Sequence, residues 1–436
     1  MSELYRASVV DDDRCRRRGH PPAEYAGTSR FRFHHVSSQR QWARGIDGIL
    51  KEQRIVMHSE AITNGRFDFT PQPDPRANGN AAVPAAAFER EDERVTEVFG
   101  SGRNRRILLI GGGGYIGVPV STELLRSGFR VRSIDNFVYG HQASVSGLLL
   151  NPGYEMSVAD LCDQIALRTA LEDVTDVVVL AGLVGDPITR KYPDCSRKIN
   201  IDGIQRCFEI FDTCKLNKVI FISTCSNYGV VAGDALATEQ TELRPLSLYA
   251  EAKVAAEAAL MERGRGDYHP TVLRFATAFG AAPRMRFDLS VNEFTRDLFL
   301  GQSELDVYDP DTWRPYCHVR DFARLIDLVL RAPAERVSHK IFNAGGERNN
   351  KTKRQIIEHI LERLPDRRVR YRDHGGDPRN YRVDFSRVSR ELGFEPQHSV
   401  SDGIDEIIAL IQAGFFNDVD MRRNYYGNYH LDHADG

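Results

Sequence analysis

The chain has 436 residues, 41% of them hydrophobic and 27% charged, which excludes a wholly disordered protein and fits a globular enzyme of more than one domain. Its 58 basic and 61 acidic residues leave a formal charge of −3, so no strong field draws it toward nucleic acid or anionic lipid. No stretch approaches the roughly 18 apolar residues of a membrane span, and the N-terminus lacks the apolar core of a signal peptide. We therefore expect a cytoplasmic protein with neither nucleic acid nor a membrane among its partners.

The first hundred residues differ in composition from the rest of the chain. They hold an acidic triplet and a basic run between residues 11 and 18, and a stretch rich in Pro, Asn and Ala from Thr70 to Ala87. One amphipathic helix is predicted over Trp42 to Val56, and the charged segment from Glu89 to Arg106 resembles a linker. We predict a partly ordered N-terminal extension over residues 1–100 and assign it no role; a small added domain for oligomerisation or for a partner is the alternative.

After residue 100, short apolar strands alternate with helices. Strands are predicted over Arg106 to Ile110, Arg130 to Asp135, Tyr154 to Ala159, Val177 to Ala181, Val219 to Ser223 and Thr271 to Phe275. Such near-continuous apolar strands separated by helices indicate a parallel sheet that is covered on both faces. From about Arg284 the elements become shorter and less regular, which predicts a smaller C-terminal lobe.

A glycine-rich loop joins the first predicted strand to a helix over Gly117 to Ser127. Its working spacing is G-x-x-G-x-x-G, with Gly111 at the sharp turn, Gly114 where the backbone approaches a pyrophosphate, and Gly117 where helix and strand pack closely. The helix N-terminus then faces the phosphates. The acid Asp135 follows Gly117 by 18 residues at the end of the second strand. A carboxylate there accepts from ribose hydroxyls and repels a 2′-phosphate, so we predict NAD in preference to NADP.

Other expected cofactor contacts lie at the ends of the first four strands. They are Tyr115 and Ile116 in the glycine loop, Asn136 beside Asp135, Asp160 and Leu161 near the adenine, and Leu180, Ala181 and Gly182 near the middle of the cofactor. Together these features predict an α/β fold with a Rossmann-type doubly wound parallel sheet. We expect an NAD-binding domain over residues 101–284 and a mainly substrate-binding lobe over residues 285–436 that is interleaved with it.

Tyr249 and Lys253 stand four residues apart in the helical stretch L-Y-A-E-A-K, so both side chains lie on one face. The Lys charge and an adjacent oxidised nicotinamide would lower the Tyr pKa toward neutrality and make the phenolate a general base. Thr224, 25 residues before Tyr249 in S-T-C-S-N-Y-G, offers a hydroxyl that can share the proton of the substrate.

These motifs resemble the extended short-chain dehydrogenase/reductase family, in particular its nucleotide-sugar epimerase/dehydratase branch. The resemblance covers roughly Arg105 to Gly414 and rests on G-G-G-G-Y-I-G, L-A-G-L-V-G-D-P, S-T-C-S-N-Y-G, Y-A-E-A-K, L-R-F-A-T-A-F-G and W-R-P-Y-C-H-V-R-D. It implies NAD as the cofactor, a nucleotide-diphosphate sugar as the substrate and a homodimer. The catalytic residues that it implies are Thr224, Tyr249 and Lys253, and the further cofactor contacts are Asn200 and Phe275.

The same resemblance implies a set of substrate contacts. Asn292 and Arg314 match residues that meet the diphosphate of the sugar nucleotide, a task that suits a planar guanidinium. Thr277 matches a position facing the sugar, and Arg379 and Tyr381 fall where the small lobe closes on the nucleotide. A purely structural role is the alternative for each of these five residues.

The resemblance leaves the reaction open. Sugar-nucleotide 4,6-dehydratases carry an Asp-Glu pair directly after the Thr, where this sequence has Cys225 and Ser226, so 4-epimerisation through a 4-keto sugar is the simplest chemistry. A reductase, a decarboxylase or a dehydratase of the same fold is the first alternative, and a non-catalytic NAD-binding scaffold is the second. We expect Cys225 to be a small buried residue rather than an acid or base.

The cysteine and histidine patterns predict no metal site. The seven cysteines include no C-x-x-C pair, which favours reduced thiols over disulfides or structural zinc. The adjacent His34 and His35 have no partner pattern, and His318 is expected to be a packed, hydrogen-bonded histidine.

Overall fold

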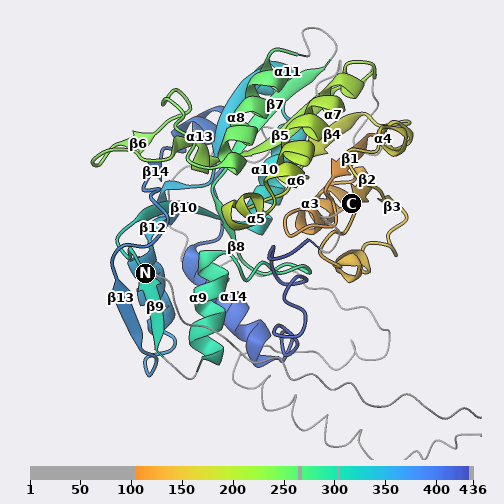
Figure 1. The fold of residues 1–436 in the computed structure, drawn as a ribbon. Coiled ribbons are helices and arrows are strands. Elements are labelled where there is room, and N and C mark those ends of the chain that lie inside the picture. Colours follow the sequence, from red (N-terminus) through yellow and green to blue (C-terminus); the bar gives the residue numbers. More distant parts are fainter. Residues whose placement is uncertain (1–103, 264–267, 302–303, 432–436) are drawn as a thin grey trace, which may run out of the picture. The chain divides into compact units, whose positions relative to one another are not determined.

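The structure, a computed structural model, describes residues 104–263, 268–301 and 304–431 (Figure 1). The contacts of the chain divide it into two units, Met1–Asn80 and Ala81–Gly436, and all the described residues belong to the second unit. The predicted N-terminal extension over residues 1–100 and its helix over Trp42 to Val56 lie outside the described residues. In the described part of the chain, no helix is both long enough and apolar enough to cross a membrane.

A sheet of seven parallel strands forms the centre of the described unit. The strands are β1 (Arg106–Ile110), β2 (Arg130–Asp135), β3 (Tyr154–Val158), β4 (Asp176–Val179), β5 (Lys218–Thr224), β7 (His269–Phe275) and β11 (Lys340–Ala344). Their order is β11-β7-β5-β4-β1-β2-β3, so the direction of winding reverses between β1 and β4. A doubly wound sheet opens a crevice outside the carboxyl ends of its strands at this reversal.

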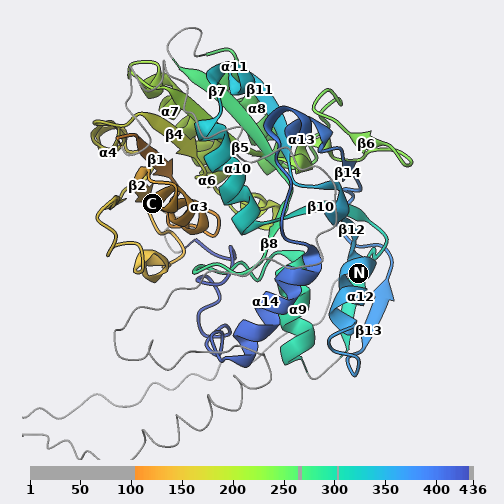
Figure 2. The same cartoon turned by 180° about the vertical axis from the view of Figure 1, so that it is seen from behind.

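Helices cover both faces of this sheet (Figures 1 and 2). One face carries α4 (Gln164–Ala170), α7 (Ile204–Phe211) and α8 (Leu248–Met261), and the other carries α3 (Gly117–Arg126), α10 (Val319–Arg331) and α13 (Ser386–Leu392). Along β1, Ile107 and Leu109 pack into the core under α3 and α10, while Leu108 and Ile110 pack into the opposite core. Burial on both faces is the reason that the strand sequences are continuously apolar.

The smaller lobe packs around a separate apolar core. It comprises α9 (Ser290–Leu300), α12 (Lys353–Leu361), α14 (Val400–Gln412), the pair β9 (Leu305–Tyr308) and β13 (Val369–Arg372), and the strands β8 (Thr277–Phe279), β10 (Trp313–His318) and β12 (Asn350–Thr352). Between these elements α10 and β11 return to the large sheet, so the two lobes share the chain as an interleaved pair. Beyond α14 the described chain continues as turns to Leu431.

Several short elements connect the two lobes and the sheet edges. They are α5 (Asp186–Lys191), α6 (Pro193–Arg197), a π-helical turn (Lys198–Gly203), the 3-10 turns η2 (Gln142–Val145), η4 (Cys225–Tyr228) and η5 (Glu347–Asn349), α11 (Ala334–Val337), and the paired strands β6 (Leu236–Ala237) and β14 (Arg382–Val383).

The predicted strands agree closely with the observed ones, and β4 shows the most informative difference. The sequence predicts a strand to Ala181, but β4 ends at Val179. The N–H groups of Leu180 and Ala181 both donate to the carbonyl of Ile110, at 2.9 and 2.7 Å, which turns the chain across the end of β1. This turn brings the small residues after β4 beside the glycine loop.

Candidate active site

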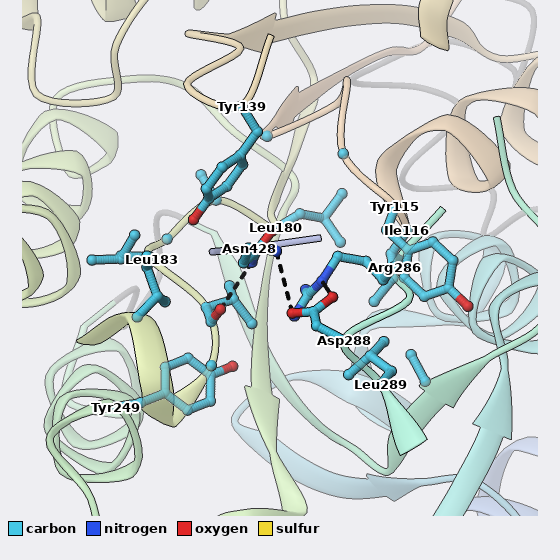
Figure 3. A pocket seen from close by; sticks show the side chains of 18 of the residues that line it. Tyr115, Ile116, Tyr139, Leu180, Leu183, Tyr249, Arg286, Asp288, Leu289 and Asn428 are labelled. Atoms are coloured by element: carbon cyan, nitrogen blue, oxygen red, sulfur yellow. Dashed lines mark hydrogen bonds and ion pairs between the residues drawn. The ribbon is translucent and has the colours of Figure 1, made fainter. Parts of the chain in front are cut away.

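One large cavity lies at the carboxyl edge of the sheet, between the sheet and the small lobe (Figure 3). Its volume is about 1230 Å³, above the 300–1,000 Å³ typical of a pocket for one small molecule, so it has room for a dinucleotide and a second ligand. The predicted site residues that line it are Gly111, Gly114, Tyr115, Ile116, Gly117, Asp135, Asn136, Asp160, Leu161, Leu180, Ala181, Gly182, Thr224, Tyr249, Lys253, Phe275, Thr277, Arg314, Arg379 and Tyr381.

The glycine loop has the geometry that a dinucleotide diphosphate requires. Gly111 has φ +89°, and a Cβ on it would lie 2.7 Å from the backbone nitrogen of Ala181. A Cβ on Gly117 would lie 2.5 Å from the carbonyl oxygen of Gly111, so the packing of the protein itself excludes side chains at these two positions. A Cβ on Gly114 would meet nothing closer than 3.5 Å. Gly114 therefore leaves its backbone open to the cavity just before α3, where the free N–H groups of a helix start favour an anion.

Asp135 and its neighbours form the end of the cavity that suits an adenosine. The two carboxylate oxygens of Asp135 accept hydrogen bonds from the backbone N–H groups of Gly113 (3.0 Å) and Phe137 (2.8 Å). Burial raises the pKa of Asp135, and these two hydrogen bonds oppose the rise. Each oxygen keeps a second lone pair, which can accept from a ribose hydroxyl. Asn136 donates to Asp160 at 2.8 Å and so ties the ends of β2 and β3 together.

The three predicted catalytic residues meet at the other end of the cavity. Thr224 ends β5, and its hydroxyl oxygen lies 2.9 Å from that of Ser226. Tyr249 and Lys253 lie on α8, with the Lys253 ammonium 5.9 Å from the centre of the Tyr249 ring. Lys253 donates to the carbonyl of Ile222 at 2.8 Å, and burial lowers its pKa to about 8. The ammonium therefore remains mostly charged at neutral pH.

Burial determines the pKa of Tyr249 in the chain by itself. Burial raises the pKa of this phenol, and the carboxylate of Asp186 raises it further, whereas Arg286 and Arg379 act in the opposite direction. The sequence predicts a lowered pKa from the spacing of Tyr249 and Lys253 together with a nicotinamide charge. In the chain by itself burial dominates, because desolvation disfavours the charged phenolate.

A cluster of paired charges lines the cavity at the small lobe. Arg379 donates to both oxygens of Asp377 at 2.8 Å and lies 2.7 Å from an oxygen of Asp186. Arg314, on β10, donates to Asp377 at 3.0 Å, and its guanidinium carbon lies 5.4 Å from the centre of the Tyr381 ring. Although burial opposes the change, the two guanidiniums hold the pKa of Asp377 below its usual range. Two preorganised guanidiniums at one place can bind a diphosphate.

Two of the predicted contacts lie behind the walls of the cavity. Asn200 is buried and uses its amide on the backbone of Leu183, accepting from the N–H at 2.8 Å and donating to the carbonyl at 2.9 Å. Asn292 is buried, accepts from the N–H of Gly280 at 3.1 Å and donates to the hydroxyl of Tyr115 at 3.0 Å. Both amides hold neighbouring loops in place, and the direct ligand contacts expected of these residues stay predictions.

The cavity also holds charged and polar residues that the sequence analysis missed. Arg286 donates to both oxygens of Asp288, at 2.6 and 2.7 Å (Figure 3). Arg284 lines the same wall, and Asn428 reaches it from the segment after α14. The charged pattern R-x-R-x-D over residues 284–288 was a usable signal, because charges inside an apolar region are rarely buried without a function. No sequence pattern pointed to Asn428.

Two expectations for polar side chains near the site are confirmed. Cys225 is buried, its thiol donates to the carbonyl of Arg274 at 3.1 Å, and burial raises its pKa. His318 is also buried, with its Nε2 3.0 Å from the carboxylate of Glu406 and its Nδ1 accepting from the N–H of Arg320. Neither side chain lines the cavity.

Comparison with known proteins gives the family and its range of reactions. Residues 107–345 match the NAD dependent epimerase/dehydratase family. The UDP-glucose 4-epimerase of Bacillus subtilis (strain 168) is 26% identical over 329 residues, which cover 70% of this chain and 94% of that protein. UDP-glucuronic acid decarboxylase 1 of Arabidopsis thaliana is 24% identical over 417 residues, which cover 87% and 91%. The structure of MoeE5 in complex with UDP-glucuronic acid and NAD has a TM-score of 0.62 at 25% identity and covers 71% of this chain and 99% of its own.

Proposed function

Because the chain belongs to the NAD-dependent epimerase/dehydratase family, we propose that it inverts C4 of a sugar carried on a nucleoside diphosphate. The cofactor of this enzyme is NAD, and the open backbone at Gly114 and the acceptor pairs of Asp135 fit that dinucleotide. One observation supports the finer proposal most directly. Tyr249 and the two guanidiniums of Arg314 and Arg379 line the same cavity, and the two residues that follow Thr224 in the sequence are not carboxylates.

The first half of the reaction uses the residues at the end of β5 and on α8. The phenolic oxygen of Tyr249 accepts the proton of the C4 hydroxyl, and the Thr224 hydroxyl shares that proton and holds the oxygen in position. Because burial favours the neutral phenol, the phenolate depends on two positive charges together: the Lys253 ammonium, 5.9 Å from the Tyr249 ring centre, and the charge that an oxidised nicotinamide would add when bound. Bound NAD supplies the hydride acceptor, and the substrate becomes a 4-keto sugar.

The residues after Thr224 favour epimerisation over elimination. Loss of water from a 4-keto sugar needs a further acid and base at the adjacent carbons. Cys225 points into the core toward Arg274, and Ser226 offers a hydroxyl, which is a weak acid and a weak base. Epimerisation would require the keto sugar to turn over in the cavity, so that the hydride returns to the opposite face of the ketone, but it needs no acid beyond the proton held by Tyr249.

Arg314 and Arg379 support a diphosphate-linked substrate. Each already has a partner in Asp377, so the guanidiniums are held in place before the ligand arrives and less side-chain entropy is lost on binding. An enzyme for simple alcohols has no need of two guanidiniums at this place, and a non-catalytic scaffold has no need of Tyr249 beside Lys253.

The test is incubation of the NAD-loaded protein with a panel of nucleotide sugars, followed by mass spectrometry and NMR. An unchanged mass with inverted C4 is the expected result. Loss of water would identify a dehydratase, loss of carbon dioxide from a uronate would identify a decarboxylase, and turnover only with added reductant would identify a reductase. If no sugar nucleotide in the panel binds, as judged by calorimetry, the proposed substrate class is wrong.

A further inference from the structure

Three buried side chains in the cavity have polar atoms with no partner among the described residues. They are Tyr139 and His141, on the loop after β2, and Arg284, just before α9 in the small lobe. Their exposed fractions are 7%, 3% and 4%. The atoms without a partner are the Tyr139 hydroxyl oxygen, both ring nitrogens of His141 and Nε of Arg284. Buried donors of this kind are uncommon in native structures, because leaving them unpaired is costly.

These side chains converge on the cofactor end of the cavity. The guanidinium carbon of Arg284 lies 4.7 Å from the centre of the Tyr139 ring, and Nε2 of His141 lies 3.7 Å from Asp135 Oδ1. The loop that carries Tyr139 and His141 is tied to the glycine loop, because Ser144 donates to the carbonyl of Gly113 at 2.9 Å. Residues of both lobes therefore meet next to the glycine loop.

Arg284 is a buried cation without a direct ion pair among the described residues, although the carboxylates of Asp288 and Asp135 lie near enough to favour its charged form. Arg286 is neutralised by two hydrogen bonds to Asp288, but Arg284 forms no ion pair with a carboxylate in the described ranges. Its hydrogen bonds go to the side-chain oxygen of Asn428 at 2.7 Å and the carbonyl of Gly427 at 3.4 Å. Burial lowers the pKa of Arg284 only to about 10, so it stays a cation at neutral pH. A buried cation that no carboxylate pairs directly is stabilised further when an anion joins it.

We propose that Arg284, Tyr139 and His141 form a second anion-binding wall of the cavity, next to the glycine loop, and bind the diphosphate of NAD together with that loop. Their donor groups suit phosphate oxygens: a guanidinium N–H, a phenol O–H and the single N–H of an imidazole that burial keeps neutral. The wall lies beside Asp135, at the ribose end.

This wall couples the cofactor to the small lobe and to the segment after α14. Asn428 holds Arg284 and also donates to the carbonyl of Val184 at 2.9 Å, while its backbone N–H donates to Asp288 at 3.3 Å (Figure 3). Asn428 is therefore a positioning residue that fixes the guanidinium across the cleft. Leu431, in the same segment, packs in one cluster with Tyr139 and Leu183.

The test compares Arg284→Gln with Asn428→Ala in the full chain freed of nucleotide. Asn428→Ala removes the acceptor that holds the guanidinium and keeps the cation, whereas Arg284→Gln removes the cation and keeps an N–H donor. Dissociation constants for NAD, ADP-ribose and adenosine are measured by calorimetry, with thermal unfolding as the check on the fold. We expect Arg284→Gln to weaken NAD and ADP-ribose by about tenfold or more, typical of a charge-assisted contact, and to leave adenosine unchanged. The loss in Asn428→Ala should be clearly smaller.

Three outcomes would overturn this assignment. Equal losses in Arg284→Gln and Asn428→Ala would make Arg284 a purely structural residue, as would equal weakening of NAD and adenosine. Unchanged NAD affinity with weakened UDP-glucuronic acid would assign the cation to the substrate. If Arg284→Gln does not fold, Tyr139→Phe, which removes one hydroxyl, decides: about threefold weaker NAD binding supports the wall, and unchanged binding rejects it. None of these measurements depends on which sugar reaction the enzyme performs.

Discussion

Two glycines of the same loop should respond in opposite ways to the same substitution. In Gly117→Ala the added Cβ would lie 2.5 Å from the Gly111 carbonyl oxygen and 2.7 Å from the backbone of Gly112, so main chain must move. Overpacking of this kind costs about 1–3 kcal/mol, more than the gain of up to about 1 kcal/mol from the better helix propensity of Ala. In Gly114→Ala the nearest atom is 3.5 Å away, an ordinary contact.

Gly117→Ala should therefore lower the melting temperature by a few degrees, since 1 kcal/mol corresponds to roughly 2–4 °C in a domain of about 150–250 residues and to no more than that in a larger unit. Gly114→Ala should leave the melting temperature of the ligand-free protein unchanged. Its methyl group fills the space through which a diphosphate approaches the backbone, so NAD affinity should fall about tenfold or more.

The assays are differential scanning calorimetry without nucleotide and isothermal titration with NAD, run on both variants and the unmodified chain. The two variants are controls for each other, because they add the same atom three residues apart. A Gly114→Ala protein with unchanged NAD affinity would refute the assignment of the diphosphate to this loop. Equal melting temperatures for the two variants would refute the packing argument.

Other substitutions test the remaining parts of the site. Tyr249→Phe removes the proton acceptor and little volume, so turnover should fall about 10²–10⁴-fold with NAD affinity unchanged by calorimetry; retention of more than about a tenth of the activity would place the base elsewhere. Asp135→Ala with Asn136→Arg should raise the ratio of NADP to NAD affinity, and an unmodified protein that already prefers NADP would contradict the role of Asp135. Arg314→Ala should weaken a nucleotide sugar about ten- to a hundredfold, from a contact worth about 1.5–3 kcal/mol, and equal weakening of NAD would indicate misfolding. Deletion of residues 1–95 should leave NAD affinity unchanged, because every predicted site residue follows Arg106; a fall in melting temperature of more than about 8 °C would show that the extension belongs to the core.

The parts of the site that follow strand ends were predictable. Parallel strands bring their carboxyl ends to one edge, so Gly111, Asp135, Leu180 and Thr224 had to meet once their strands were identified. The pair Tyr249 and Lys253 was predictable for a similar reason, since residues four apart share a helix face. In each case the regular geometry of a single strand or helix determines where the side chain points.

The parts of the site that join distant segments were not predictable in this way. Asn200 and Asn292 stand in the expected motifs, but their amides pair with Leu183 and Tyr115, contacts that exist only once the loops are packed. The approach of Asn428 to Arg284 spans 144 positions along the chain, and no periodicity relates the two residues.

The sequence by itself therefore determined the parallel sheet, the glycine loop between β1 and α3, and the placement of Tyr249 and Lys253 on one helix face, because these depend on short-range geometry and strand order. Only the tertiary structure decided which polar groups face the cavity, which form hydrogen bonds to other loops of the protein, and which have no hydrogen-bond partner. In the chain by itself burial also raises the pKa of Tyr249, because desolvation depends on everything packed around the phenol and not on its neighbours in sequence.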